Sequence, residues 1–191
     1  MKHKLLIPIL LVFILITQNS ANAQLKTKSP QTVCRFLQEY GIVSIDGNYE
    51  YDEYSNEDDI GQYFCASGAI PLKTVENAYF KYYVEGDLHQ AKLVELQVNI
   101  YSRESVELSH KKLQEIASTL YLKVTGRKIS DKIKNAITKS IKSPEGIIAH
   151  EEVDNLDISV NKKYYSAHSS GFRFYGITVS FSNKDIKKLK S

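Results

Sequence analysis

The order in which strand and helix patterns follow one another constrains this fold most strongly. Residues 77–101 contain two runs of aromatic and branched side chains on either side of Glu85-Gly86-Asp87, which is typical of a β-hairpin. Two amphipathic helical stripes follow, over residues 102–125 and 130–141. Three further strand patterns complete the chain, at residues 146–150, 156–161 and 171–182. This order predicts an α+β fold in which an antiparallel sheet is covered on one face.

A shorter helical pattern precedes the hairpin. Apolar residues recur at helical spacing over residues 32–40, and Gly41 is a suitable stop for a helix. Residues 62–66 form a short strand pattern. We therefore predict one domain over residues 32–191, with an N-terminal helix and two central helices packed on the same face of the sheet.

The first 23 residues have the pattern of a secretory signal peptide. Two lysines precede a twelve-residue apolar run, Leu5–Ile16, and an Ala-Asn-Ala cleavage site ends at residue 23. Twelve apolar residues are too few to span a bilayer, which needs roughly twenty. The absence of a cysteine after this run argues against a lipid anchor. The sequence thus predicts a cleaved signal peptide at 1–23, a flexible linker at 24–31, and a periplasmic or extracellular location.

Cys34 and Cys65 are the two cysteines of the chain. In an exported protein such a pair indicates a disulfide, here between the N-terminal helix and the short strand. Closing a loop of about thirty residues contributes roughly 3–4 kcal/mol of stability. Two unrelated buried thiols are the alternative. A catalytic cysteine is disfavoured because neither residue has a His or Lys within four positions.

The segment between Phe36 and Leu72 carries eight acidic residues and no Lys or Arg. Removing residues 1–23 lowers the formal net charge of the chain from +3 to +1. The mature chain is therefore nearly neutral, and the strong negative charge is confined to this segment. Interleaved tyrosines are effective interface residues. We predict an acidic docking face for a protein partner with a basic face, formed by Tyr49, Glu50, Tyr51, Asp52, Glu53 and Tyr54.

Two other interpretations of the acidic segment remain open. The first is a solvated loop without a partner. The second is an irregular calcium site, because Asp46, Asn48, Glu50 and Glu57 occupy ligand positions of a calcium-binding loop. A standard EF-hand is excluded, because Tyr51 stands where that loop requires glycine.

Residues 127–142 carry six bases and one acid, with isoleucines every four residues. We interpret them as a helix that packs its Ile stripe on the sheet and leaves its lysines in water; an anionic polymer or membrane surface is the alternative. The mature chain is too close to neutral for a nucleic-acid-binding protein.

Motifs for enzymatic chemistry are missing from the sequence. It contains no nucleophile elbow, no C-x-x-C and no glycine-rich phosphate loop. Two glutamates follow His150, but no second histidine lies four residues away, which disfavours zinc. His168 lies in a Ser-rich turn where a Ser–His pair is conceivable but unsupported. We predict no cofactor and no metal, and an enzyme is the less favoured reading.

Four segments resemble a family of small exported bacterial proteins whose function is not known. They read CRFLQEYGI, QYFCAS, ENAYFKYYVEG and KLVELQVNIYS, within residues 33–125. The resemblance implies a disulfide-braced periplasmic domain and no catalytic residue.

The sequence therefore favours an exported, non-enzymatic binding protein, such as an immunity protein or an inhibitor of a toxin or cell-wall hydrolase. Two alternatives remain: an envelope-assembly accessory protein, and a secreted hydrolase with an acidic site.

Overall fold

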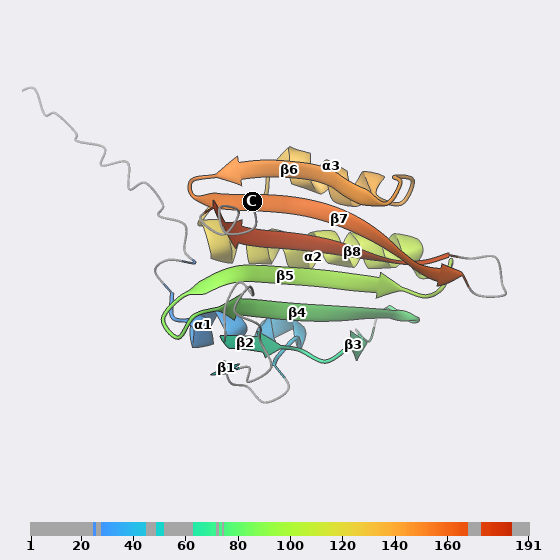
Figure 1. Ribbon diagram of the computed structural model, residues 1–191. Helices are drawn as coiled ribbons and strands as arrows, with labels where there is room; N and C mark the ends of the chain where they lie inside the picture. Colours follow the sequence, from blue (N-terminus) through green and yellow to red (C-terminus); the bar gives the residue numbers. More distant parts are fainter. Residues whose placement is uncertain are drawn as a thin grey trace, which may run out of the picture.

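The protein folds around an eight-stranded antiparallel sheet, as a computed structural model shows (Figure 1). The structure describes residues 25, 28–44, 49–51, 63–71, 73, 75–167 and 173–184. In these residues the helices are α1 (Pro30–Cys34), α2 (Val106–Thr125) and α3 (Asp131–Lys139). The strands are β1 (Glu50–Tyr51), β2 (Tyr63–Ala66), β3 (Ile70–Pro71), β4 (Ala78–Gly86), β5 (Ala91–Ile100), β6 (Gly146–Val153), β7 (Leu156–Ala167) and β8 (Arg173–Asn183).

The strands lie in the order β1-β2-β4-β5-β8-β7-β6, and β3 pairs with β4. All three helices pack behind the sheet in Figure 1, so the viewer looks onto the face that no described helix covers. The predicted α+β fold, with helices on one face of an antiparallel sheet, is confirmed. The last strand, β8, lies in the middle of the sheet between β5 and β7.

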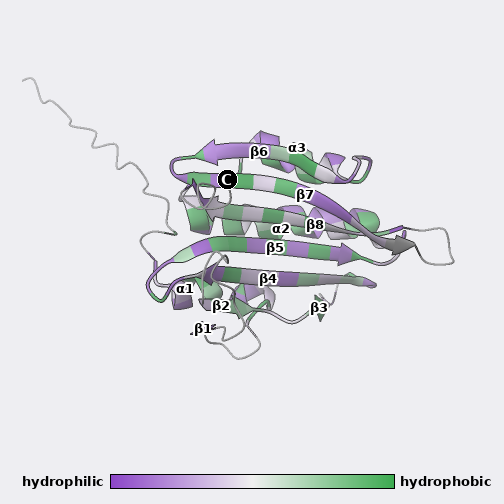
Figure 2. Ribbon diagram, in the orientation of Figure 1, coloured by the Kyte–Doolittle hydropathy of each residue, from purple (hydrophilic) through white to green (hydrophobic). Residues whose placement is uncertain are grey.

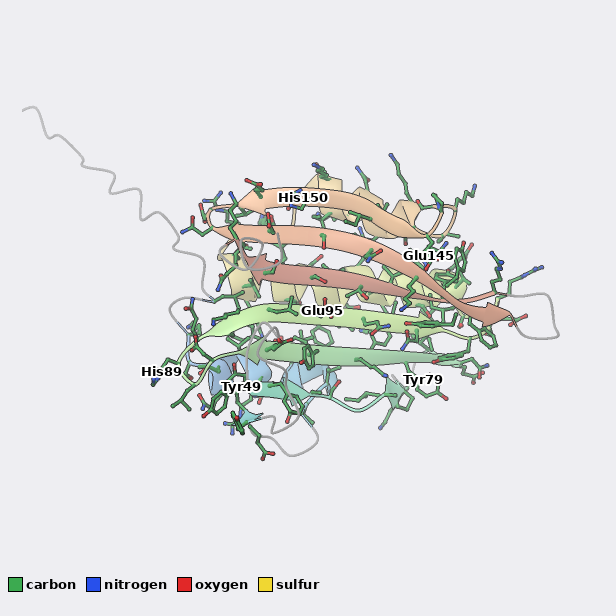
Figure 3. All side chains as sticks on the ribbon, in the orientation of Figure 1. Tyr49, Tyr79, His89, Glu95, Glu145 and His150 are labelled. Carbon is green, nitrogen blue, oxygen red and sulfur yellow. A yellow bond between two sulfur atoms is a disulfide. The ribbon has the colours of Figure 1, made fainter. Side chains whose placement is uncertain are left out.

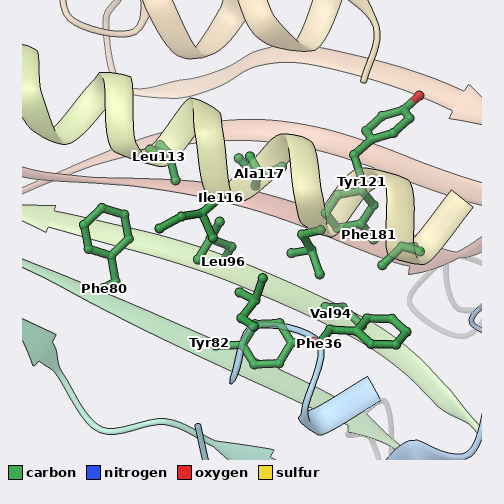
Figure 4. Close-up of a cluster of buried hydrophobic side chains, with 14 of the residues drawn as sticks. Phe36, Phe80, Tyr82, Val94, Leu96, Leu113, Ile116, Ala117, Tyr121 and Phe181 are labelled. Carbon is green, nitrogen blue, oxygen red and sulfur yellow. The ribbon is translucent and has the colours of Figure 1, made fainter. Parts of the chain in front are cut away.

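Hydrophobic and hydrophilic residues alternate along the strands, so the two faces of the sheet differ in polarity (Figure 2). In β4, for example, Phe80, Tyr82 and Val84 point toward the helices and are buried. Figure 4 shows how Phe80, Tyr82 and their neighbours meet the apolar side of α2. The central members of this core are Phe36, Phe80, Tyr82, Val94, Leu96, Leu113, Ile116, Ala117, Tyr121 and Phe181.

A disulfide joins Cys34 at the end of α1 to Cys65 in β2, which confirms the predicted pairing. The Tyr82 hydroxyl adds a buried hydrogen bond of 2.8 Å to the Val33 carbonyl. The predicted helix over residues 32–40 is divided: α1 ends at Cys34, and a 3₁₀ turn covers Gln38–Tyr40. Both helix types return side chains to one face every three to four residues, so their apolar spacing looks alike in a sequence.

A serine precedes each of the two central helices, but only the one before α3 caps its helix with its side chain. Ser130 accepts a hydrogen bond from the Ile133 amide at 3.2 Å, as a helix N-cap does. The expected start of α2 at residue 102 is wrong by about one turn, because Ser102 instead forms a turn with the Ser105 amide. The predicted Ile stripe is buried at Ile129, Ile133 and Ile137, but α3 ends at Lys139, and Ile141 beyond it is 37% exposed.

Two buried polar side chains fasten α3 to its surroundings. Lys162 is 1% exposed, and its ammonium donates hydrogen bonds to three main-chain carbonyls after the end of α3. His110 donates from Nδ1 to the Ile137 carbonyl at 2.9 Å and accepts at Nε2 from the Tyr175 hydroxyl at 3.1 Å. Burial lowers the pKa of His110, so the imidazole is neutral in the fold.

None of the helices in the described residues is both long and apolar enough to cross a membrane. The predicted signal peptide lies outside the described residues, and so do residues 24, 26 and 27 of the predicted linker. Of the described linker residues, Leu25 is buried in the core, and Pro30 and Gln31 already belong to α1.

Candidate functional site: the open face of the sheet

The face of the sheet away from the helices, here called the open face, carries the exposed side chains of the long strands. Strand pairing arranges them in transverse rows. One row runs from Glu50 through Phe64 and Glu85 to Leu93, across four strands. The same row continues through Ser182, Asp157 and Glu152 on β8, β7 and β6. Acidic residues thus gather at this end of the open face.

Three acids and two rings form what we call the acidic corner, at β1, β2 and the end of β4. Its members are Glu50, Glu85, Asp87, Phe64 and Tyr83. The rings of Phe64 and Tyr83 lie 6.2 Å apart, and the Tyr83 hydroxyl donates to Glu85 at 3.2 Å. Glu50 is exposed, whereas Tyr51, which is 51% exposed, lies on the other face of β1, where its ring contacts Tyr63. The corner therefore offers carboxylates and aromatic surface together.

Asp87 holds the turn between β4 and β5. Its carboxylate accepts from the amides of His89 and Gln90 and pairs with Lys92 at 3.2 Å. Burial alone would raise the pKa of Asp87, but these amides and the Lys92 ammonium lower it below its ordinary value. Asp87 thus remains ionised and contributes negative charge to the corner.

Tyr49 lies beneath the acidic corner and not on it. The residue is 8% exposed, and its ring stacks on Tyr63 with centroids 5.9 Å apart. Within the described residues its hydroxyl has no hydrogen-bond partner. Burial raises the pKa of Tyr49, and the negative charges of Asp87 and Glu85 raise it further. This side chain supports the corner but has little surface to offer a partner.

The predicted docking residues are thus described only in part. Glu50 and Tyr51 are exposed and Tyr49 is buried, while Asp52, Glu53 and Tyr54 lie outside the described residues. The other suggested calcium ligands, Asp46, Asn48 and Glu57, and the turn around His168 also lie outside them. The sequence analysis missed Glu85 and Asp87, although the predicted hairpin already placed them at a turn.

A hollow of about 300 Å³ opens next to the corner, between β2, β4 and β5. Glu95, Tyr83 and Lys81 contribute to its lining. Glu95 lies near the middle of β5 in Figure 3 and accepts a hydrogen bond of 2.7 Å from Ser180. A carboxylate beside an aromatic ring suits the head of a basic side chain.

The opposite end of the open face is aromatic and braced by a polar network. The Tyr101 ring contacts Tyr79 and Phe174, with centroids 5.6 and 5.2 Å apart. The side chain of Gln97 bridges Asn99 and Tyr165 at 2.8 and 2.6 Å. These atoms cross β8 directly over Gly176, where a Cβ would lie 2.8 Å from the Asn99 oxygen. Glycine at this position therefore lets the network lie flat on the sheet.

A second charged cluster lies at the far edge of the open face, on the β6–β7 hairpin (Figure 3). His150 Nε2 lies 3.0 Å from Asp157 Oδ1, and Glu152 pairs with Lys184. One ligand atom from each of His150, Glu152 and Asp157 lies within 4.8 Å of the others. The sequence analysis sought a second histidine at helical spacing and so missed Asp157, which the hairpin register places directly opposite Glu152.

Comparison with known proteins adds no assignment, since no family model, no curated protein and no solved structure matches the chain.

Proposed function

We propose that the protein is an exported, non-enzymatic binding protein that recognises a protein partner with a basic face through the acidic corner. The observation that carries the proposal is the convergence of Glu50, Glu85 and Asp87 with the half-buried rings of Phe64 and Tyr83 at one end of an uncovered face of the sheet. An immunity protein or an inhibitor of a toxin or hydrolase acts in this way.

Charge and side-chain type support this role. The acids come from two separate segments, β1 and the β4–β5 hairpin, and a basic partner would relieve the repulsion among them on binding. Lys92 pairs with Asp87. Tyr83 supplies contact area with little loss of side-chain entropy. The hollow beside Glu95 would accept one Arg or Lys of the partner.

The disulfide agrees with export, since such bonds persist in oxidising compartments. The resemblance to small exported proteins points the same way and stays a prediction, as do the signal peptide and the periplasmic location.

The test is charge reversal at the corner. Affinity capture from the source organism would first supply the partner. In the variant Glu50→Lys/Glu85→Lys we expect association to slow by at least about tenfold at low salt, because steering by charge accelerates association by about 10–10³-fold. The difference should shrink as salt screens both proteins. Stopped-flow or surface-binding kinetics at several salt concentrations measures it.

The matched control is Glu104→Lys/Glu145→Lys, which reverses two exposed acids elsewhere. It changes the net charge by the same amount and should bind nearly as the wild type does. Equal association rates and equal salt dependence in the wild type and the corner variant would refute the proposed face. Asp87 is left unchanged because its carboxylate holds the hairpin turn.

A further inference from the structure

We propose that His150, Glu152 and Asp157 form a binding site for a divalent transition-metal ion such as Zn²⁺. Cross-strand pairing places Glu152 directly opposite Asp157, and His150 lies two residues before Glu152 on the same face of β6. This metal site goes beyond the proposed function and does not depend on it, because it lies at the opposite edge of the sheet from the acidic corner.

The hairpin holds two of the three donors in place before any ion binds. Asp157 has a side chain that is 6% exposed, and its Oδ1 already lies 3.0 Å from His150 Nε2. The adjacent turn is fastened by an Arg127–Asp154 ion pair of 2.8 Å and by a hydrogen bond from the Lys184 amide to the Asn155 carbonyl. A site with preformed donors binds an ion with little loss of conformational entropy.

The charges at the site call for a cation. Like charges directly opposite each other on antiparallel strands repel, and the carboxylates of Glu152 and Asp157 face each other in this way. Because Asp157 is buried, water screens the repulsion poorly. The Lys184 ammonium pairs with Glu152. The cluster thus already draws one positive group, which a metal ion would replace.

The donor set selects the class of metal. One imidazole nitrogen with two carboxylate oxygens suits zinc and similar ions, whereas Mg²⁺ and Ca²⁺ prefer oxygen donors alone. Zinc bonds of about 2.0–2.2 Å hold neighbouring donors about 3.4 Å apart in a tetrahedron. His150 and Asp157 need only a slight opening to reach that spacing. Glu152 has a side chain that is 57% exposed and can rotate to complete the set, with water at the open position.

The experiment is calorimetric titration of the tag-free protein, stripped with a chelator, with ZnCl₂. We expect one zinc ion per chain and no comparable binding of MgCl₂ or CaCl₂. His150→Ala should weaken zinc binding by at least about tenfold, the size of effect seen even for residues that only support a ligand. The matched control His89→Ala removes an exposed histidine from another hairpin and should bind zinc as the wild type does.

A second pair of variants tests the competition by lysine. Lys184→Ala removes the ammonium at Glu152 and should tighten zinc binding, whereas Lys163→Ala, on the same face, should not. Circular dichroism of each variant verifies the fold. The proposal is overturned if the wild type takes up no zinc, or if His150→Ala and His89→Ala bind zinc equally well.

Discussion

Lys162 is a buried lysine whose removal tests how α3 is held on the sheet. An ammonium has three N–H donors, and the carbonyls of Ser140, Ile141 and Ser143 accept them at 2.7, 3.2 and 3.0 Å. The same nitrogen lies 4.7 and 4.4 Å from the ring centroids of Tyr164 and Tyr175. Lys162, which lies on β7, therefore caps the C-terminal end of α3. The positive charge also complements the negative end of the helix dipole.

The substitution Lys162→Met keeps the apolar stem and removes the charge and the donors. Each hydrogen bond to a charged group contributes roughly 1.5–3 kcal/mol, and each desolvated cation–π contact about 0.5–2 kcal/mol. The methionine variant avoids the several kcal/mol that it costs to bury a charged ammonium, and the partly exposed carbonyls bind water in its place. The buried Ser140 carbonyl loses its donor, at a cost of about 1–3 kcal/mol. Balancing these contributions, we expect a net loss of about 2–4 kcal/mol in the free energy of unfolding.

Denaturant unfolding followed by circular dichroism measures this loss, and the melting temperature should fall by about 5–15 °C. The neighbouring residue gives a matched control, because Lys163 is exposed on the open face. Lys163→Met should change stability by less than about 0.5 kcal/mol. If Lys162→Met is as stable as Lys163→Met, the capping argument is wrong.

The remaining predictions concern the disulfide and the buried histidine. Replacing both cysteines with alanine should lower the free energy of unfolding by about 3–4 kcal/mol, because the bond closes a loop of 31 residues; two free thiols in the denatured, unreduced wild type would contradict the bond itself. His110 has a pKa below its unfolded value. Its contribution to stability is therefore fully present above the unfolded pKa of about 6.5 and is lost as the pH falls from there through the lower pKa of the folded state, with a slope of at most about 1.4 kcal/mol per pH unit. Unfolding curves between pH 5 and 7.5 should show a weaker dependence in His110→Gln than in His89→Ala, and equal slopes would contradict the assignment.

The order of elements was predictable because periodicity alone encodes it. Val179 and Phe181 alternate with polar residues along a strand, and Ile133 and Ile137 recur one helical turn apart. In the structure both sets of apolar side chains are buried. Boundaries were harder, because local hydrogen bonds decide them. Ser102 forms a turn and not a helix cap, and the spacing of apolar residues does not distinguish these two possibilities.

The polar contacts were not predictable in the same way, because they depend on register between distant segments. Lys162 lies in the polar sequence Asn-Lys-Lys and looks exposed, yet the end of α3 buries it. Asp157 lies within the predicted strand 156–161, but only the hairpin register places it opposite Glu152. A two-residue turn at Asp154-Asn155, with Asp154 at a φ of 54°, fixes that register. An Asp-Asn pair between two strand patterns was the available clue.

The central position of β8 has a consequence for the timing of folding. The ribosome makes this strand last among the described elements, yet Val94 of β5 and Ile158 of β7 both pair with its Phe181. The two hairpins on either side form from local contacts, but each keeps an open edge until β8 arrives. At about 5–20 residues per second, synthesis from the end of β5 to the end of β8 takes roughly 4–16 s. Through that interval the edges of β5 and β7 that β8 later covers stay unpaired, and loss of the last strand would divide the sheet into two parts joined only through the helices behind it.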